Sequence, residues 1–186
     1  MILRIATLAL CLAAPFGATH AATVWATDNA ASTLEFTGSA DGEAFTGTFK
    51  KFDAKIEFEP NDLEHSSFAV SIDLTSADSG NSDRDETLQG EEFFDTATTS
   101  GATYAASRFT KKEDGSFSAN GDLTLNGVTK PVPLHFTWKA DAKSATLVGE
   151  ATIDRTEFNV GTGDWADESS IRHEVKVKTT LKLGTQ

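Results

Sequence analysis

Alternation of apolar and polar residues with a period of two is the feature that most restricts how this chain can fold. In residues 52–59, written FDAKIEFE, every second side chain is apolar and the intervening ones are charged. An extended strand places such a set on one face, so the alternation is typical of a strand with one buried face. The same alternation is clear in residues 68–74, 132–138, 147–153 and 175–183, and weaker in residues 33–38, 43–50, 103–110 and 116–125. We therefore predict about eight strands.

Turn-forming dipeptides separate several of these strands. Asp41-Gly42, Asp114-Gly115 and Asn126-Gly127 suit hairpin turns with positive φ angles. The spacing between strands is short and even, which favours an antiparallel meander over β-α-β units. Strands with one apolar face must close into a barrel or stack as a sandwich. A barrel of about eight strands can be filled by its own side chains or can hold one slender ligand, and the alternation alone leaves both open.

Two segments, residues 77–102 and 155–171, break the alternation. The first contains most of the acidic stretch SADSGNSDRDETLQGEEFFD, in which we predict a short helix capped by Asp83, with Glu86 at the capping-box position. Counted from Asn81, this stretch is close to the spacing of an EF-hand loop. Glu86, however, occupies the position where that loop needs glycine, and a strand rather than a helix precedes it. A solvated, acidic helix start is therefore favoured over a calcium site.

Residues 1–21 have the composition of a cleaved secretory leader. Arg4 gives an early positive charge, an apolar run follows, and small residues come after a Pro/Gly break. The apolar run is too short to span a bilayer. We therefore expect an exported protein that works in the periplasm, with residues 22–186 as one mature domain.

Cysteine content and charge exclude several classes of function for this mature domain. The one cysteine, Cys11, leaves with the leader, which excludes disulfides, thiol chemistry and cysteine-zinc sites. The formal net charge of −12 becomes more negative when Arg4 is removed. Such a charge repels nucleic acids and anionic membrane surfaces, so we expect no nucleic-acid binding.

No residue is singled out for catalysis or for metal binding. The sequence contains neither a G-x-S-x-G nucleophile elbow nor an H-E-x-x-H pair. His65, His135 and His173 share no spacing that would bring them together, and His135 alternates with apolar neighbours so that it should face outward. We therefore predict no catalytic residue, no metal ligand and no cofactor.

The acidic stretch resembles the signature of the YceI-like family of exported, lipocalin-like barrels associated with polyisoprenoid binding. The matching positions are Ser76, Gly80, Arg84-Asp85, Leu88 and Phe93-Phe94-Asp95. Three further segments agree in order: GTFKKFDAKIEFEPNDLEHSSFAVSIDL, GDLTLNGVTKPVPL and IDRTEFNVGTGDW, the last of which contains the Arg-x-x-Phe motif of the family. The resemblance covers residues 24–184. The chain departs from the pattern at Thr87, where many members have histidine, at Asn159, where glycine is common, and in lacking a proline ahead of the strand at 103–110.

This resemblance implies an all-β fold: an antiparallel eight-stranded lipocalin-like barrel with a short helix that caps one end. It also implies that the barrel is hollow and binds a polyisoprenoid, a quinone or another long-chain lipid of the fatty-acid type, for transport or storage. Each buried methylene contributes about 0.8 kcal/mol, so such a chain can bind without a specific headgroup contact. A homodimer, and a membrane protein that donates or accepts the lipid, are the further partners that we consider.

The candidate ligand-binding residues form the inward apolar face of this barrel. They are Phe36, Phe52, Ile56, Phe58, Val70, Ile72, Leu74, Phe93, Phe94, Leu123, Leu125, Leu134, Phe136, Trp138, Ile153 and Phe158. Arg84 and Asp85 are predicted to fix the helical segment by pairing and by hydrogen bonds, or else to contact a headgroup. Two alternatives remain: an enzyme that acts on a small lipophilic substrate inside the barrel, and a filled, stress-related structural barrel without a ligand.

Overall fold

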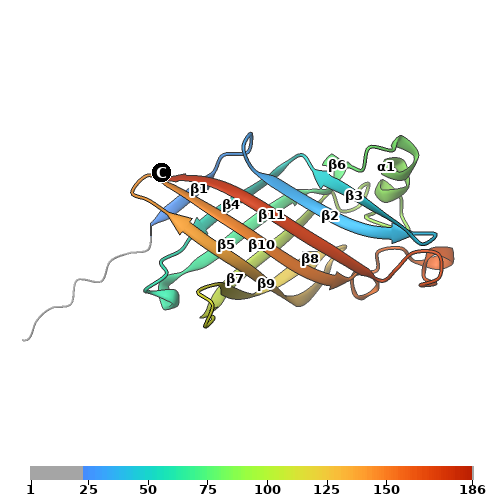
Figure 1. Ribbon diagram of the computed structural model, residues 1–186. Coiled ribbons are helices and arrows are strands. Elements are labelled where there is room, and N and C mark those ends of the chain that lie inside the picture. Colours follow the sequence, from blue (N-terminus) through green and yellow to red (C-terminus); the bar gives the residue numbers. More distant parts are fainter. Residues whose placement is uncertain (1–22, 186) are drawn as a thin grey trace, which may run out of the picture.

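The computed structural model describes residues 23–185, so the predicted leader lies outside the described residues and stays a prediction (Figure 1). The strands are β1 (Val24–Thr27), β2 (Thr33–Ala40), β3 (Glu43–Phe49), β4 (Phe52–Glu57), β5 (Ser67–Asp73), β6 (Ala77–Asp78), β7 (Gly101–Lys111), β8 (Phe117–Leu125), β9 (Val128–Ala140), β10 (Ser144–Asp154) and β11 (Glu174–Thr185). The helices are α1 (Ser82–Gln89) and the 3-10 turns η1 (Leu63–His65), η2 (Leu74–Ser76), η3 (Arg155–Phe158) and η4 (Gly163–Trp165). None of these helices is long and apolar enough to cross a membrane.

The strands form one closed antiparallel barrel (Figure 1). β1 and β2 both pair with β11 and act as one interrupted strand. β3 and β4 likewise act as one interrupted strand, because β3 pairs with β2 and β4 pairs with β1. β5 and β6 act as a third, because β5 pairs with β4 and β6 pairs with β3. With β7 to β11 following in chain order, the barrel has eight strands, and the predicted fold class is confirmed.

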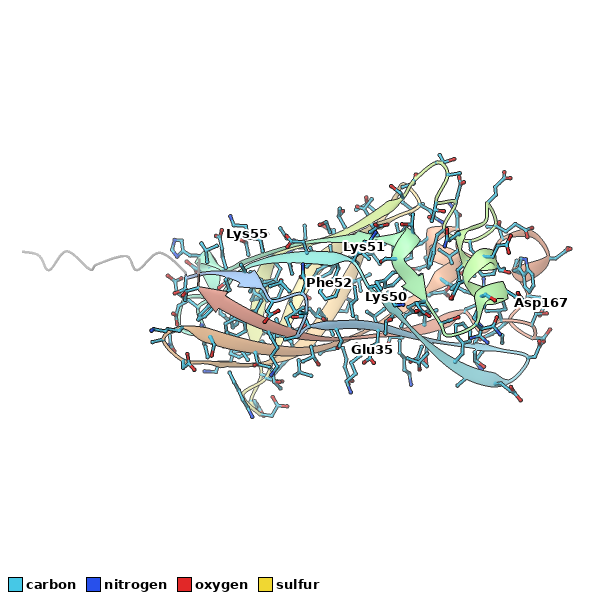
Figure 2. All side chains as sticks on the ribbon, turned by 90° about the horizontal axis from the view of Figure 1, so that it is seen from above. Glu35, Lys50, Lys51, Phe52, Lys55 and Asp167 are labelled. Carbon is cyan, nitrogen blue, oxygen red and sulfur yellow. The ribbon has the colours of Figure 1, made fainter. Side chains whose placement is uncertain are left out.

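The predicted strands at residues 43–50 and 52–59 correspond to β3 and β4, which are two parts of one interrupted strand of the barrel. The chain bends at Lys50 and Lys51, which Figure 2 places at mid-length of the barrel. The Lys50 backbone N–H donates to the Ser76 carbonyl at 3.1 Å, and the Lys51 N–H donates to the Ser76 hydroxyl at 3.0 Å. These bonds replace the regular ladder across the bend, so the barrel stays closed there.

The cap of α1 differs from the prediction. The side chain of Asn81, rather than Asp83, accepts the Arg84 N–H at 3.0 Å and forms the N-cap. Asn and Asp are equally good caps, so composition alone does not choose between them. Asp83 and Asp85 fall instead in the first helical turn, where their charge is favourable at the positive end of the helix dipole.

Aspartates with a Ser or Thr two residues later fix several bends. Asp73, Asp114 and Asp154 each accept a backbone N–H and the hydroxyl of that residue. The hydroxyl hydrogen bond is the largest cause that lowers the pKa of each carboxyl group below its usual value. Because the folded state favours the ionised form, this stabilisation is present at neutral pH and is lost as the pH falls through the lowered pKa values.

Candidate functional site

The barrel contains a cavity of about 400 Å³ at one end. We call this the open end; it carries α1 and residues 155–173, and Figure 2 shows Asp167 there. Along β11 the inward side chains of Val175 and Val177 are half-buried, whereas Leu181 and Leu183, further from the open end, are buried. The alternation of the strand is the same throughout, so the difference reflects space inside the barrel. The unfilled space of the interior therefore lies towards the open end.

Packed aromatic rings fill the other end of the barrel, which we call the closed end. The ring of Phe58, which is 2% exposed, has its centroid within 5.0–5.9 Å of five other rings. Those rings belong to Phe68, Phe109, Phe117, Phe136 and Trp138, and Trp25 packs on Trp138. The alternation of the strands left open whether the barrel is filled by its own side chains or is hollow. The structure has a hollow half and a half filled by aromatic rings.

Most of the predicted ligand-binding residues line the cavity, although no ligand contact is tested. The lining ones are Phe36, Phe52, Ile56, Val70, Ile72, Leu74, Phe93, Phe94, Leu123, Leu125, Leu134 and Ile153. Phe58, Phe136 and Trp138 instead form part of the closed end, so we correct their placement. Phe158 belongs to the loop that follows β10; it is buried and does not line the cavity either. Alternation identifies the inward face of a strand but not how far along it the cavity extends.

Sequence reasoning missed several residues of the cavity wall. Among them are Tyr104, Ala151, Val175 and Val177. The last two share the predicted inward face of the final strand, so the alternation could have identified them. Ala151 carries no such signal, because a small residue on an inward face is equally common in a packed core.

Tyr104 is fixed to the wall of the cavity. Its hydroxyl lies 3.1 Å from the Val132 carbonyl and 3.3 Å from the Ala119 carbonyl, with either of which it can bond. Burial raises its pKa to about 12, so the phenol is neutral at physiological pH. Its ring also lies against Gly121, where an added Cβ would come within 2.4 Å of the ring carbon. Tyr104 is therefore a rigid, uncharged part of the wall.

Two segments cover the open end and are joined through Glu92. The backbone N–H groups of Gly161 and Thr162 donate to the Glu92 carbonyl at 2.7 and 2.9 Å. The indole N–H of Trp165 donates to the Glu92 carboxylate at 2.8 Å, and the Trp165 ring lies 5.7 Å from that of Phe93. Residues 90–95 and the loop after β10 thus form one connected cover over part of the cavity.

Arg155, the arginine of the Arg-x-x-Phe motif, holds the loop after β10 in place. It is 3% exposed, and its guanidinium donates to the carbonyls of Val160, Gly161, Trp165, Ile171 and Arg172 at 2.7–3.0 Å. Burial lowers its pKa from the ordinary arginine value, and the nearby charges of Asp154 and Glu168 oppose that shift. Sequence reasoning noted the motif but assigned this residue no role.

Gly161 is required beside this guanidinium. Its φ of +72° lies in the left-handed region, and a Cβ there would be 2.2 Å from Nη1 of Arg155. Asn159, which stands where the family pattern commonly has glycine, also has a positive φ, of 56°. Asn is one of the few residues besides glycine that adopt this conformation readily, so the substitution keeps the turn.

Arg84 and Asp85 do not form the predicted pair, whereas the predicted hydrogen bonding is present for Asp85. Asp85 accepts the backbone N–H of Ser79 at 2.8 Å, which fixes the approach to α1. Arg84 lies with its guanidinium carbon 4.2 Å from the centre of the Phe45 ring and lines the cavity. Successive residues of a helix do not face each other, so adjacency in sequence does not produce an ion pair.

The cavity wall offers little for catalysis or metal binding. Apart from Tyr104, its titratable residues are Asp83, Arg84, Arg155 and Arg172. Within residues 23–185 no group of three or more His, Cys, Asp or Glu residues is placed to hold a metal ion. His135 is exposed on the outer face, as predicted. The wall therefore suits an apolar chain better than a reacting polar group.

A family model described as the YceI-like domain matches residues 25–183. The chain is similar to a UPF0312 protein of Vibrio campbellii, with 30% identity over 160 residues, which are 82% of this chain and 85% of the relative. It is also similar to a UPF0312 protein of Vibrio vulnificus, with 31% identity over 170 residues, which are 86% of this chain and 90% of the relative.

Two solved structures share the fold. Burkholderia cenocepacia BcnA matches with a TM-score of 0.80 and 30% identity, over 84% of this chain and 98% of that chain. A polyisoprenoid binding domain from Saccharophagus degradans matches with a TM-score of 0.70, over 88% of this chain and 99% of that chain. The second likeness has 18% identity and shows the fold alone.

Proposed function

This chain belongs to the YceI-like family, and from that premise we propose that it is an exported binding protein for a long-chain lipid. The apolar tail of a polyisoprenoid, a quinone or a fatty-acid-type lipid would occupy the cavity. One observation carries this proposal: inward residues such as Val177 and Ile153 line an apolar cavity in one half of the barrel, while aromatic rings pack around the buried Phe58 in the other half. A barrel selected only for stability would gain by filling both halves.

The size and chemistry of the cavity agree with this ligand class. A volume of about 400 Å³ falls within the range of small-molecule sites, roughly 300–1,000 Å³. From Val175 to Leu181 the lining strand runs about 20 Å, at a rise of about 3.3 Å per residue. With the strand tilt typical of barrels, this is about 15 Å along the axis. A longer tail would bend inside the cavity or leave through the open end.

The relatives and the predicted leader support a role in handling lipids outside the cytoplasm. The Saccharophagus degradans domain is described as polyisoprenoid binding, and the same class of ligand fits the apolar wall here. A lipid tail crossing the aqueous periplasm must be shielded from water, at about 0.8 kcal/mol per methylene. Transport or storage of such a lipid, with a membrane protein as donor or acceptor, follows as the proposed role. A homodimer is compatible with it.

Filling the cavity tests this proposal. Ala151 lines the cavity, whereas its neighbour Thr152 is exposed on the outer face of β10. We expect A151W to weaken binding of a fluorescent fatty acid and of a short prenyl quinone by at least about tenfold, because the indole takes up the space of the tail. The matched variant T152W adds the same side chain outside the barrel and should bind as the wild type does.

Circular dichroism and thermal melting would first establish that both variants fold. If a folded A151W binds these lipids with unchanged affinity, the tail does not occupy this cavity, and the proposed function is wrong.

A further inference from the structure

Positive charge is distributed unevenly between the cavity and the outer surface. Three of the four arginines among residues 23–185 line the cavity, namely Arg84, Arg155 and Arg172, whereas none of the lysines does. Asp83 is the one carboxylate among the described residues of the wall. In a chain of net charge −12, this local excess of cations at an apolar cavity is unexpected.

Two of these guanidinium groups are available to a ligand. Arg155 uses all its donors on backbone carbonyls. Arg84 stacks on the ring of Phe45, which orients the guanidinium while its N–H groups remain at the edge of the plane. Within the described residues, neither Arg84 nor Arg172 forms an ion pair or a side-chain hydrogen bond through its guanidinium.

Both residues lie at the open end. Arg84 is on α1, and Arg172 lies two residues before β11 in the loop that Arg155 holds in place. Figure 1 shows α1 and this loop at the same end of the barrel. Arg172 is exposed and also lines a second, polar pocket with Ser39, Ser170 and Glu168, so this residue stands at the boundary between the apolar cavity and solvent. A headgroup attached to a buried tail would come to rest at this boundary.

We propose that the occupant of this cavity is a single-tailed lipid with a small anionic headgroup, a carboxylate or a phosphate, bound by Arg84 and Arg172. The inference rests on the proposed function and specifies its ligand class. Guanidinium groups match carboxylate and phosphate oxygens in geometry, and the low-dielectric wall strengthens that attraction. An uncharged headgroup gains no such interaction. The strongly acidic surface would otherwise disfavour an anionic lipid, so these arginines reverse the local field where the headgroup lies.

Three lipids with the same tail and different headgroups test this inference: hexadecanol, palmitate and hexadecyl phosphate. Their affinities are measured for the full mature protein by displacement of a fluorescent apolar probe at low salt. We expect one or both anions to bind at least about tenfold more tightly than the alcohol. The tighter of the two anions identifies the headgroup. The double variant R84Q/R172Q should lose this preference, because both guanidinium groups that bind the anion are removed.

Arg108 supplies the matched control, because it is exposed on β7 and does not line the cavity. The single variants R84Q and R172Q are measured beside the double variant. R108Q changes the net charge by the same amount as either of them and should keep the preference for anions. Equal affinity of the wild type for all three lipids overturns the headgroup inference and leaves the proposed function standing. Binding of none of the three overturns the headgroup inference, and failure of the short prenyl quinone to bind as well overturns the proposed function. If R108Q loses the preference for anionic lipids as much as R84Q or R172Q does, the effect comes from net charge. That result overturns the headgroup site at Arg84 and Arg172.

Discussion

Replacing Arg155 by methionine is expected to lower the free energy of unfolding by about 3–5 kcal/mol. The substitution removes every donor from five backbone carbonyls that the buried guanidinium now satisfies. Methionine has a similar volume, so the loss comes mainly from those unsatisfied acceptors rather than from a cavity. The loop after β10 should open, and amide hydrogen exchange within residues 155–173 should accelerate more than exchange elsewhere.

Two further variants separate charge from geometry at this position. R155K keeps the positive charge but cannot reach five carbonyls at once, so its stability should lie between those of R155M and the wild type. R108M removes an exposed arginine from β7 and should change stability by no more than about 0.5 kcal/mol. Urea denaturation measures all three. An R155M protein as stable as R108M would contradict the role assigned to Arg155.

Replacing Phe58 by alanine is the second change with a large expected effect, again about 3–5 kcal/mol of stability. Phe58 is 2% exposed and contacts five aromatic rings at the centre of the closed end. Its ring does not line the cavity, so F58A should still bind lipid when folded. F58L, which keeps much of the volume, should lose less than about 1.5 kcal/mol.

The same variant distinguishes the two halves of the barrel by function. Removing the ring extends the empty space toward the closed end, so F58A should accept longer tails better, relative to short ones, than the wild type does. Calorimetric unfolding and a series of fatty acids of increasing length measure both effects. A small loss of stability together with loss of all lipid binding would place Phe58 in the ligand site and contradict this division.

Much of the barrel could be predicted because its determinants are local. The alternation in residues 52–59 and the turns at Asp114-Gly115 and Asn126-Gly127 each specify a strand face or a reversal within a few residues. Neighbouring strands then pair in chain order, and the closed antiparallel sheet follows. β1 was not predicted, because four residues are too few to display a period.

The division of the interior into a hollow and a filled half could not be predicted. Ile56 on β4 and Phe58, which directly follows this strand, belong to the same alternation, yet one lines the cavity and the other lies in the closed end. What separates them is the meeting of Phe58 with Phe136 and Trp138, some eighty residues further along the chain. Such packing depends on the closed barrel rather than on any local pattern.

The roles of the arginines were equally hidden from sequence reasoning. Arg84 was expected to pair with its neighbour Asp85, but the helix directs the two side chains apart. Arg155 was noted only as part of a motif, because its carbonyl partners belong to a loop with no regular structure. Backbone acceptors leave no trace in the residue types of that loop, so the sequence carries no signal for them.

Native mass spectrometry of the protein, expressed with its own N-terminal segment and purified without detergent, tests the central claim most directly. We expect a one-to-one adduct that leaves on extraction with organic solvent and is identified as a single long-chain lipid. Added fatty acid or prenyl quinone should restore that adduct to the extracted and refolded protein. A clean apo mass that does not change with any added lipid would contradict the account and leave a barrel whose cavity holds no lipid.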